Sequence, residues 1–574
     1  MSVLPIILVR GFDLLGGSAA DPFHGWNEGT VNPHKLGDNY IYEGMVVRFL
    51  KTELKLPQDQ GSTTYLDATN ALNYAASTRQ QTGIDPNRLA RLKTDFGHLP
   101  ESTLTEWLTG RIWVDETIAK QYKGKHNTFW VFRYYDFAGA AAKRSLEVEA
   151  DGLAETIERV LAITGAPSVY LICHSMGGVI ARCMMQRTYL LKQKSAGLNM
   201  TDDQFVLTAP PAARTAAKKL ALSRVAKWIT MGTPHRGVPF QVVPTDFYAE
   251  TEYFNAEFFA RKMGKKSDDK RTPDQFLGDT KAFFDPERVL CVVGTNHRAY
   301  GGVMGSVTRS ANQVVSWLQG KEANHSDGLI KQSSAALAGA YKAFVHKPHT
   351  GRDSLISCRE SFELAVRFLF GDVRVRLRLE SLTIRRSKKI MSRLGQMLDG
   401  KPEYFIGFSV KPRRVDFFLN QMTKDSENCF GPFSTEAIKT DQIKWDKEDK
   451  SKDGVVFEGV FNSALANFNP KTDEFKDLAY RVDIYIGERD SYLLGFSDTK
   501  IVDDTFYMLL VNEGGALKAV LVPNDRGTNA GMIAQPLVNN RCRFVVPSGL
   551  VHENVAMTLS LEIDPSQSAL MPTG

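Results

Sequence analysis

A serine followed closely by two glycines lies between an apolar run and a helical pattern in "SVYLICHSMGGVIARCMM" (residues 168–185). The stretch predicts a strand, a sharp turn at Ser175 and a helix, an arrangement that exposes a serine Oγ at the carboxyl edge of a sheet. Such a turn needs small residues two positions before and after the serine, because helix and strand pass closely there. Gly177 meets the second requirement and Gly178 adds room, whereas Cys173 replaces the usual first glycine. The pattern predicts a nucleophile; a chance H-S-M-G is the alternative.

An acid and a base that could activate this serine follow it in the order Ser, Asp, His. Asp327 lies in a tight S-D-G turn, although an ordinary aspartate that caps the next helix is the alternative. His349 lies in the loop between a predicted strand at 341–346 and a helix expected to begin near Asp353. Because serine is a poor nucleophile by itself, His349 would take its proton and Asp327 would orient the imidazole. His346, which closes the strand, is the alternative base.

Two backbone amides are predicted to bind the oxyanion that forms when a carbonyl is attacked. In "ILVRGFD" (7–13) a glycine-containing turn directly follows the first predicted strand, where enzymes with a serine elbow place one donor. The donors would be the N–H groups of Phe12 and Met176. Losing one such donor costs about 2.7–4 kcal/mol of transition-state stabilisation. The alternative is a turn that simply ends the strand.

The surrounding elements must bring these residues together. Six apolar runs rich in β-branched and aromatic residues alternate with helical patterns through the first part of the chain. This alternation predicts a mostly parallel sheet covered by helices on both faces. Residues 145–164 carry one apolar helical face and lead into the strand before Ser175. The predicted strands are 5–9, 129–135, 168–173, 225–231, 288–294 and 341–346.

Two long insertions interrupt the alternation, at about residues 13–126 and 238–285. We expect both to lack regular strands and to serve as caps over the site or as added packing. The second insertion carries three phenylalanines at helical spacing, Phe247, Phe254 and Phe258. They suit a lid that offers apolar surface to an acyl chain and make these residues candidates for lining the substrate. A helix packed permanently on the core is the alternative.

The pattern changes near residue 373, where "VRVRLRLESLTIRR" alternates with a period of two and places Arg374, Arg376 and Arg378 on one strand face. Further alternating runs, separated by Gly, Asn, Asp and Pro, predict a separate β-rich, sandwich-like domain over residues 373–574. The arginines could contact anionic head groups, and a solvated strand face is the alternative. Residues 426–454 are the most hydrophilic stretch and are expected to form a surface loop.

Length and composition limit the remaining possibilities. The chain has 574 residues, 43% hydrophobic and 24% charged, which is typical of a globular protein of two or three domains. A net charge of +6 is mild for this length and does not suggest a nucleic-acid partner. Six cysteines without C-x-x-C spacing indicate neither a zinc site nor a disulfide framework. With no recognisable signal peptide or membrane span, we expect cytoplasmic synthesis, with any export independent of a signal peptide.

In combination, five motifs resemble the lipase branch of the α/β-hydrolases. They are "VRGF" (9–12), "YYDFAGA" (134–140), "LICHSMGG" (171–178), "TMGTPHRG" (230–237) and "HSDGLIKQSSA" (325–335). This branch includes bacterial lipases and glycosylphosphatidylinositol-deacylase-like proteins, and its relatives include lipase effectors of bacterial type VI secretion. Members usually carry His-Gly at the oxyanion turn and Gly-His-Ser-x-Gly at the elbow, where this sequence has Arg10 and Cys173.

The resemblance covers residues 1 to about 368 and implies an α/β-hydrolase catalytic domain over residues 1–370, with the insertions as cap or lid. It implies that neither a metal nor an organic cofactor is needed. His235 belongs to a motif that usually lines the site, so the resemblance implies a structural or substrate-lining role for it. His174, beside the serine, is common in the family and is not the base.

We therefore expect a serine hydrolase that cleaves carboxylic esters of lipids, a phospholipase or lipase, through an acyl-enzyme on Ser175. Its partners would be the lipid ester, a membrane contacted peripherally, and an immunity protein if the chain is a secreted antibacterial toxin. An acyltransferase with the same three residues shares every motif and is the first alternative. The second is a non-catalytic lipid- or protein-binding module, which the departures at Arg10 and Cys173 favour.

Overall fold

A computed structural model describes the greater part of the chain. The described residues are 3–11, 44–57, 60–74, 84–133, 145–237, 255–297, 325–349, 353–384, 402–412, 415–424, 426–434, 436, 438, 454–462, 467–469, 474–492, 495–513, 516–523, 533–547 and 555–564. Three of the predicted site residues, Phe12, Phe247 and Phe254, lie outside these segments.

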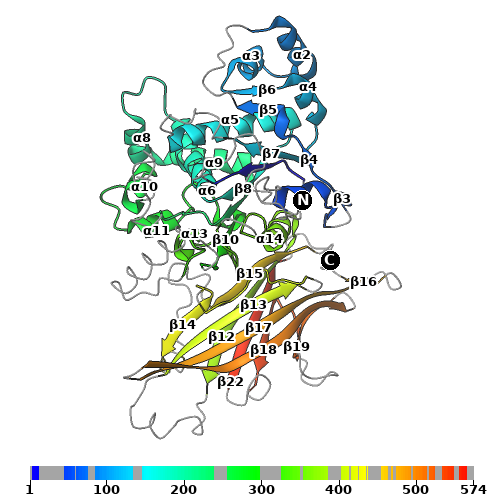
Figure 1. The fold of residues 1–574 in the computed structure, drawn as a ribbon, viewed down its shortest axis with the longest axis vertical. Helices are drawn as coiled ribbons and strands as arrows, with labels where there is room; N and C mark the ends of the chain where they lie inside the picture. The colour runs from blue at the N-terminus through cyan, green and yellow to red at the C-terminus, as the bar shows by residue number, and fades with distance from the viewer. Residues whose placement is uncertain are drawn as a thin grey trace, which may run out of the picture.

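The amino-terminal part is built on a parallel sheet of seven strands, in the order β11-β10-β9-β8-β1-β7-β4 (Figure 1). All six apolar runs are strands of this sheet, and each neighbouring pair runs parallel, which confirms the predicted α/β class. The bounds are β1 (Ile6–Val9), β4 (Leu66–Asp67), β7 (Thr128–Phe132), β8 (Val169–His174), β9 (Val225–Met231), β10 (Val289–Gly294) and β11 (Tyr341–Val345).

The direction in which the chain winds reverses at β1. From β1 the chain moves to β7 on one side, and after β8 it continues through β9, β10 and β11 on the other. Ligands of open α/β sheets bind beyond the carboxyl ends of the strands at such a reversal, because the connections there leave in opposite directions. Ser175 directly follows β8 and Gly11 follows β1 after one residue, so both lie at this point of the sheet.

Side chains of the strands pack into two separate cores, because successive residues of a strand point to opposite faces. In β1, Ile7 and Val9 belong to one core, and Ile6 and Leu8 belong to the other. Helices α5, α6 and α9 cover the first face, and α1 and α14 cover the second. The helices are α1 (Met45–Lys51), α5 (Leu146–Thr164), α6 (Met176–Cys183) with a π-helical continuation (Met184–Thr188), α7 (Tyr189–Leu191), α8 (Asp202–Thr208), α9 (Pro211–Arg224), α13 (Gln332–Ala335) and α14 (Arg359–Phe370).

Two helix predictions have different outcomes. The helix predicted over 145–164 is α5, within one residue at its start. The helix expected to begin near Asp353 begins six residues later, as α14, after Cys358 at its amino-terminal cap. Asp353 has a φ of 55°, which is incompatible with the start of a right-handed helix. No described helix combines the length and the apolar character needed to cross a membrane.

The first insertion contains short strands, contrary to the expectation. Its β4 pairs with β7 and extends the main sheet. Two further pairs form small antiparallel ribbons, β2 (Leu54–Lys55) with β3 (Ser62–Thr63) and β5 (Leu72–Tyr74) with β6 (Ile112–Val114). Strands of two or three residues are too short to leave a periodic signal in the sequence, which is why the pattern missed them.

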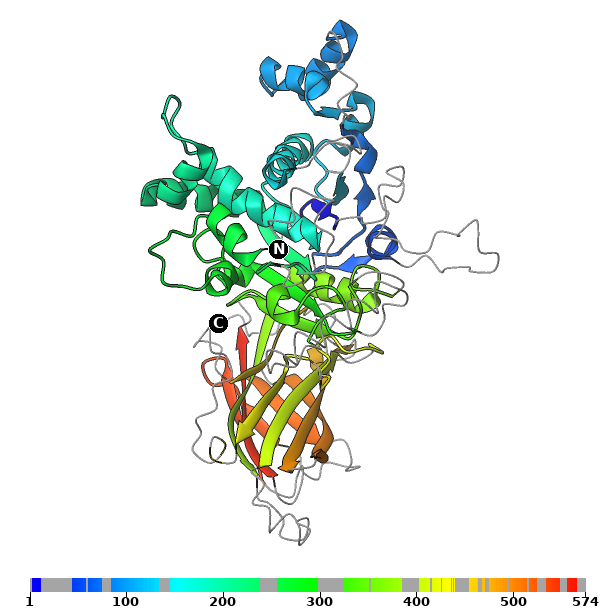
Figure 2. The same cartoon turned by 60° about the vertical axis from the view of Figure 1, so that its left-hand side comes forward.

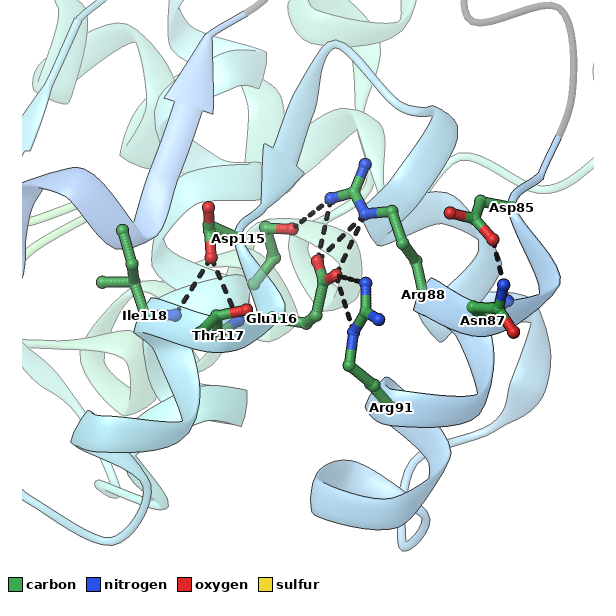
Figure 3. Close-up of polar contacts among 9 residues, drawn as sticks. Asp85, Asn87, Arg88, Arg91, Asp115, Glu116, Thr117 and Ile118 are labelled. Atoms are coloured by element: carbon green, nitrogen blue, oxygen red, sulfur yellow. Dashed lines mark hydrogen bonds and ion pairs between the residues drawn. The ribbon is translucent and has the colours of Figure 1, made fainter.

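A buried carboxylate joins two helices of the same insertion (Figure 3). Glu116 accepts hydrogen bonds from Arg88 at 2.9 Å and from Arg91 at 2.6 Å. Burial alone raises the pKa of Glu116, but the bonds from the two arginines outweigh it and lower the pKa to about 2. These two ion pairs therefore connect α4 to α2. The helices here are α2 (Pro86–Phe96), α3 (Glu101–Thr109) and α4 (Glu116–Ala119).

The described part of the second insertion packs against the core through α10 (Ala256–Lys262) and α11 (Pro273–Gly278). In α10 the fully buried ring is that of Phe259, whose centroid lies 5.6 Å from Cζ of the buried Arg182. Phe258 is half-buried beside Lys262. For α10, these contacts support the packed helix over a lid.

The carboxyl-terminal part is β-rich, as predicted, and its two antiparallel sheets share one hydrophobic core (Figure 2). One sheet has the order β15-β12-β22-β21; the other runs β14-β13-β17-β18-β19-β20, with β16 paired to β17. The bounds are β12 (Val373–Ile384), β13 (Pro402–Pro412), β14 (Cys429–Ser434), β15 (Val455–Phe461), β16 (Asn467–Asn469), β17 (Glu474–Tyr492), β18 (Gly495–Glu513), β19 (Ala516–Pro523), β20 (Ile533–Pro536), β21 (Arg541–Val546) and β22 (Val555–Asp564).

Each of the three arginines of β12 has an acidic neighbour. Arg376 Nε lies 2.7 Å from Glu458 Oε1, and Arg378 Nε lies 3.9 Å from Glu562 Oε2. Arg374 pairs with a carboxylate of the amino-terminal part. Since each cation has an acidic neighbour, this face attracts an anionic head group less than three unpaired arginines would.

The stretch 426–454 is not entirely a surface loop. Strand β14 lies within it, and Ser426 and Asn428 before the strand are buried. Their polar groups are hydrogen-bonded inside the protein; Ser426 Oγ, for example, donates to the carbonyl oxygen of Thr423 at 2.7 Å. Hydrophilic composition predicted exposure here, but polar residues can be buried once their hydrogen bonds are satisfied.

Candidate active site

Ser175 lies in a strained turn between β8 and α6. Its backbone has φ 51° and ψ −123°, a conformation that side chains other than glycine rarely adopt. The strand before it is held in place by neighbours on both sides, and the Ser175 N–H donates to the carbonyl oxygen of Met231 at 2.9 Å. The serine residue is half-buried.

The two glycines after the serine allow a close passage of backbone. A Cβ on Gly177 would lie 2.2 Å from the carbonyl oxygen of Val9, and a Cβ on Gly178 would lie 2.1 Å from Thr233 Oγ1. Both distances are far below van der Waals contact. Cys173 is fully buried in β8, and burial raises the pKa of its thiol. A buried thiol that resists ionisation is a packing residue, which agrees with its interpretation as a tolerated small variant.

The three residues predicted as a triad lie in one hydrogen-bonded chain. Ser175 Oγ is 3.0 Å from Nε2 of His349, and Nδ1 of His349 is 2.7 Å from Oδ2 of Asp327. The side chains of His349 and Asp327 are each 1% exposed. The chain therefore runs from the hydroxyl of a half-buried serine to a buried carboxylate, the order of groups that acid–base activation of a serine requires.

The loop of Asp327 determines which tautomer His349 adopts. Oδ1 of Asp327 accepts from the N–H groups of Leu329 at 3.0 Å and Ile330 at 2.7 Å. Oδ2 is left for the imidazole, so Nδ1 of His349 carries the proton and Nε2 accepts from the serine hydroxyl. The His349 N–H also donates to the Asp327 carbonyl oxygen at 2.9 Å, which fixes the two loops to each other.

Sequence reasoning missed two glycines beneath the acid–base pair. A Cβ on Gly232, which has φ 54°, would lie 2.8 Å from Nδ1 of His349 and 2.9 Å from Oδ2 of Asp327. A Cβ on Gly294 would lie 2.6 Å from the Asp327 Cβ. Their positions in the sequence could have identified them. Gly232 directly follows β9 and Gly294 ends β10, so both lie at the sheet edge where the site is expected.

His174 contacts the base directly. Its Nε2 donates to the carbonyl oxygen of His349 at 3.1 Å, and the two rings lie 4.7 Å apart. Burial lowers the pKa of His174 well below its usual range, and the adjacent His349 lowers it further. A neutral His174 agrees with its interpretation as a residue that is not the base.

Two other histidines lie away from the serine. His346 is exposed, and its Nδ1 is 3.1 Å from Oγ1 of Thr295. His235 is fully buried, with Nε2 at 3.1 Å from Thr230 Oγ1 and its ring edge-on to Trp228. Of the two roles expected for His235, these surroundings fit the structural one.

The oxyanion donors are described in part. Met176 is the first residue of α6, where backbone N–H groups lack partners within the helix. Phe12 lies outside the described residues, but Gly11 before it is described. A Cβ on Gly11 would lie 2.8 Å from the Ser175 Cβ, so the turn after β1 passes directly beside the serine. Of the predicted lining residues, only Phe258 and His235 can be located. No group of three or more His, Cys, Asp or Glu suited to a metal occurs among the described residues.

Comparison with known proteins adds little to this geometry. No protein-family model matches the chain, and no curated protein matches it. A solved structure similar to it is that of the lin2722 gene products from Listeria innocua, with 11% sequence identity, a TM-score of 0.26, and coverage of 64% of this chain and 94% of that one. A similarity this low supports no conclusion about family or activity.

Proposed function

We propose that this protein is a serine hydrolase of the α/β-hydrolase type, which cleaves carboxylic esters of lipids through an acyl-enzyme on Ser175. The observation that carries the proposal is the position of His349, hydrogen-bonded to Ser175 on one nitrogen and to buried Asp327 on the other. An aspartate that only caps a helix and a histidine without a catalytic role would not be expected to form one hydrogen-bonded chain with Ser175. The elbow conformation of Ser175 supports the same reading.

The reaction follows from the hydrogen-bonded chain. His349 Nε2 takes the hydroxyl proton as Ser175 Oγ attacks the ester carbonyl, and then gives it to the departing alcohol. Water next enters the same position and attacks the acyl carbonyl as His349 takes one of its protons. His349 then returns this proton to Ser175 Oγ as the bond between Oγ and the acyl carbon breaks and the acid leaves. Asp327 stabilises the imidazolium in both halves. The Met176 N–H, with that of Phe12, would hold the oxyanion.

The lipid part of the proposal rests on the sequence motifs and on the phenylalanines at helical spacing in the second insertion. Phospholipids or neutral glycerides would be the substrates, reached through peripheral contact with a membrane. If the protein is a secreted antibacterial toxin, an immunity protein would be its further partner.

A fluorophosphonate probe tests the chemistry. We expect wild type to be labelled at Ser175, located by mass spectrometry, and the Ser175→Ala variant not to be labelled. A folded wild-type protein that resists the probe would favour the non-catalytic binding module and overturn the proposal.

A lipid panel tests the substrate class. Phospholipids, triglycerides and short water-soluble esters, each assayed with wild type and Ser175→Ala, should show Ser175-dependent release of fatty acid from the lipids. Hydrolysis of the short esters alone would contradict the lipid assignment while leaving the serine hydrolase intact. Adding an alcohol acceptor and analysing the products separates hydrolysis from acyl transfer.

A further inference from the structure

The loop that carries Asp327 is a closed hairpin. Its ends meet where the Gln332 N–H donates to the carbonyl oxygen of His325 at 3.0 Å, and residues 326 and 331 form an antiparallel bridge. Inside the hairpin the Asp327 N–H donates to the Ile330 carbonyl oxygen at 3.1 Å. Because two hairpin amides also bind the carboxylate, the position of the hairpin determines the position of the acid.

This hairpin is attached to the carboxyl-terminal part through one buried side chain. Gln332 is fully buried at the start of α13, and its Oε1 accepts a hydrogen bond from the Glu427 N–H at 2.8 Å. Glu427 lies just before β14. The bond joins residues that are 95 positions apart in the sequence.

The strand that leads to His349 has a second attachment to the same segment. β11 is the edge strand of the parallel sheet, with β10 as its neighbour. On its outer side the Phe344 N–H donates to Oδ1 of Asn420 at 3.2 Å, and the Phe344 carbonyl oxygen accepts from the Gln421 N–H at 2.8 Å. These bonds pair edge groups that a sheet leaves open. Phe344 precedes His349 by five residues.

Residues 419–424 and 426–428 are themselves held by hydrogen bonds. Asn420 is 3% exposed and bonds to β13 through its backbone, with the Val410 N–H donating to its carbonyl oxygen at 2.8 Å. Its Nδ2 donates to the Phe408 carbonyl oxygen at 3.2 Å, and its Oδ1 also accepts from Asn428 Nδ2 at 3.3 Å. Hydrogen bonds thus reach from β13 to the Asp327 hairpin and to β11, the strand that leads to His349.

We propose that residues 419–424 and 426–428 of the β-rich part position Asp327 and His349 for catalysis, with Gln332 and Asn420 as the positioning residues. The inference rests on the proposed function and deepens it: the β-rich part is a structural component of the catalytic site, in addition to any role in delivery. An error of about 1 Å in the placement of catalytic groups can cost roughly 10²-fold in rate, so small shifts of either loop are enough to be measured.

The test uses the full chain and three variants. Gln332→Met keeps the shape but leaves the Glu427 N–H without its acceptor, whereas Gln332→Glu restores an acceptor. Asn462→Ala is the matched control: Asn462 is also buried and also joins the two parts, its Nδ2 donating to the Lys55 carbonyl oxygen at 2.9 Å, but this acceptor belongs to β2 and not to the Asp327 hairpin or to β11. The measurements are kcat and KM on a soluble ester and the rate of fluorophosphonate labelling.

We expect Gln332→Met to lower kcat and the labelling rate by about 10-fold with KM within about twofold, because groups are misplaced without loss of substrate contacts. Gln332→Glu should recover most of the rate, and Asn462→Ala should match wild type. If Gln332→Met does not fold, Asn428→Ala loosens Asn420 more gently and should lower kcat by a smaller factor.

Three outcomes would overturn the inference. A folded Gln332→Met, or a folded Asn428→Ala, with wild-type kcat and labelling rate would show that the segment does not position the pair, and would leave the proposed function standing. An equal loss in Asn462→Ala would mean that joining the two parts matters only for general stability. Absence of labelling in the wild type would remove the proposed function and this inference together.

Discussion

The two halves of the candidate site are built differently. The nucleophile half is local: strand β8, the strained turn at Ser175 and helix α6 are consecutive in the sequence, and β8 is hydrogen-bonded on both sides. The acid–base half consists of two loops near the sheet edge, where β11 has one neighbouring strand and a segment of the β-rich part bonds to its outer side. The nucleophile half therefore has its strand, turn and helix encoded consecutively, whereas the acid–base half combines two loops whose further contacts come from a distant part of the chain.

The largest expected effect comes from removing the nucleophile or the base of the hydrogen-bonded chain. Ser175→Ala and His349→Ala should each lower kcat/KM by on the order of 10⁴-fold or more, and the double variant should be no worse, because the two halves act as one unit. Steady-state kinetics on a soluble ester measures this. Multiplicative losses in the double variant would mean that the halves act separately. His346→Ala, the alternative base, should retain activity.

A smaller loss of activity is expected when a methyl group is added beside the turn that carries Ser175. Gly177→Ala places a Cβ 2.2 Å from the Val9 carbonyl oxygen, a backbone atom that cannot move aside easily. We expect a loss of about 1–3 kcal/mol in the free energy of unfolding and roughly 10²-fold in labelling rate. Chemical denaturation and probe kinetics check both. A variant with wild-type stability and labelling would contradict the close packing of the elbow.

A variant of Glu116, which is bound to two arginines away from the triad residues in the sequence, tests whether a loss of stability alone lowers activity. Its lowered pKa means that its contribution is present above the ordinary carboxyl pKa and is lost as the pH falls through about 2. Glu116→Gln should reduce stability at neutral pH by about 2 kcal/mol and flatten the pH dependence of unfolding between about pH 4.5 and 2. Labelling at neutral pH and moderate temperature should be unchanged. A slower labelling rate would show that the site is sensitive to stability in general.

The smallest effect is expected at Cys173. Cys173→Ala removes one buried sulfur from behind the elbow and should cost about 1 kcal/mol, measured by thermal unfolding. Since burial raises the pKa of the thiol, iodoacetamide should leave the folded wild type active. Inactivation by alkylation at Cys173 would contradict its assignment as a packing residue.

The elements that could be predicted are those with a strong local pattern. The six strands of the parallel sheet and helix α5 carry continuous apolar runs or one apolar face, and the order of Ser175, Asp327 and His349 follows directly from the sequence. Strands of two or three residues, such as β4, have no such pattern. The start of α14 was predicted too early because the backbone of Asp353, not its residue type, excludes a helix there.

The sequence by itself determined the composition of the site, since residue types at a strand end, a tight turn and a loop define which groups can act as nucleophile, acid and base. Only the tertiary structure decided how these groups meet. Three contacts join segments that are distant in the chain. They are the hydrogen bond between His349 and Asp327, the close packing of both side chains on Gly232, and the hydrogen bond between Gln332 and Glu427. Local patterns report which face of an element is apolar, but the pairing of buried polar groups depends on which elements become neighbours, and that is settled when the chain packs.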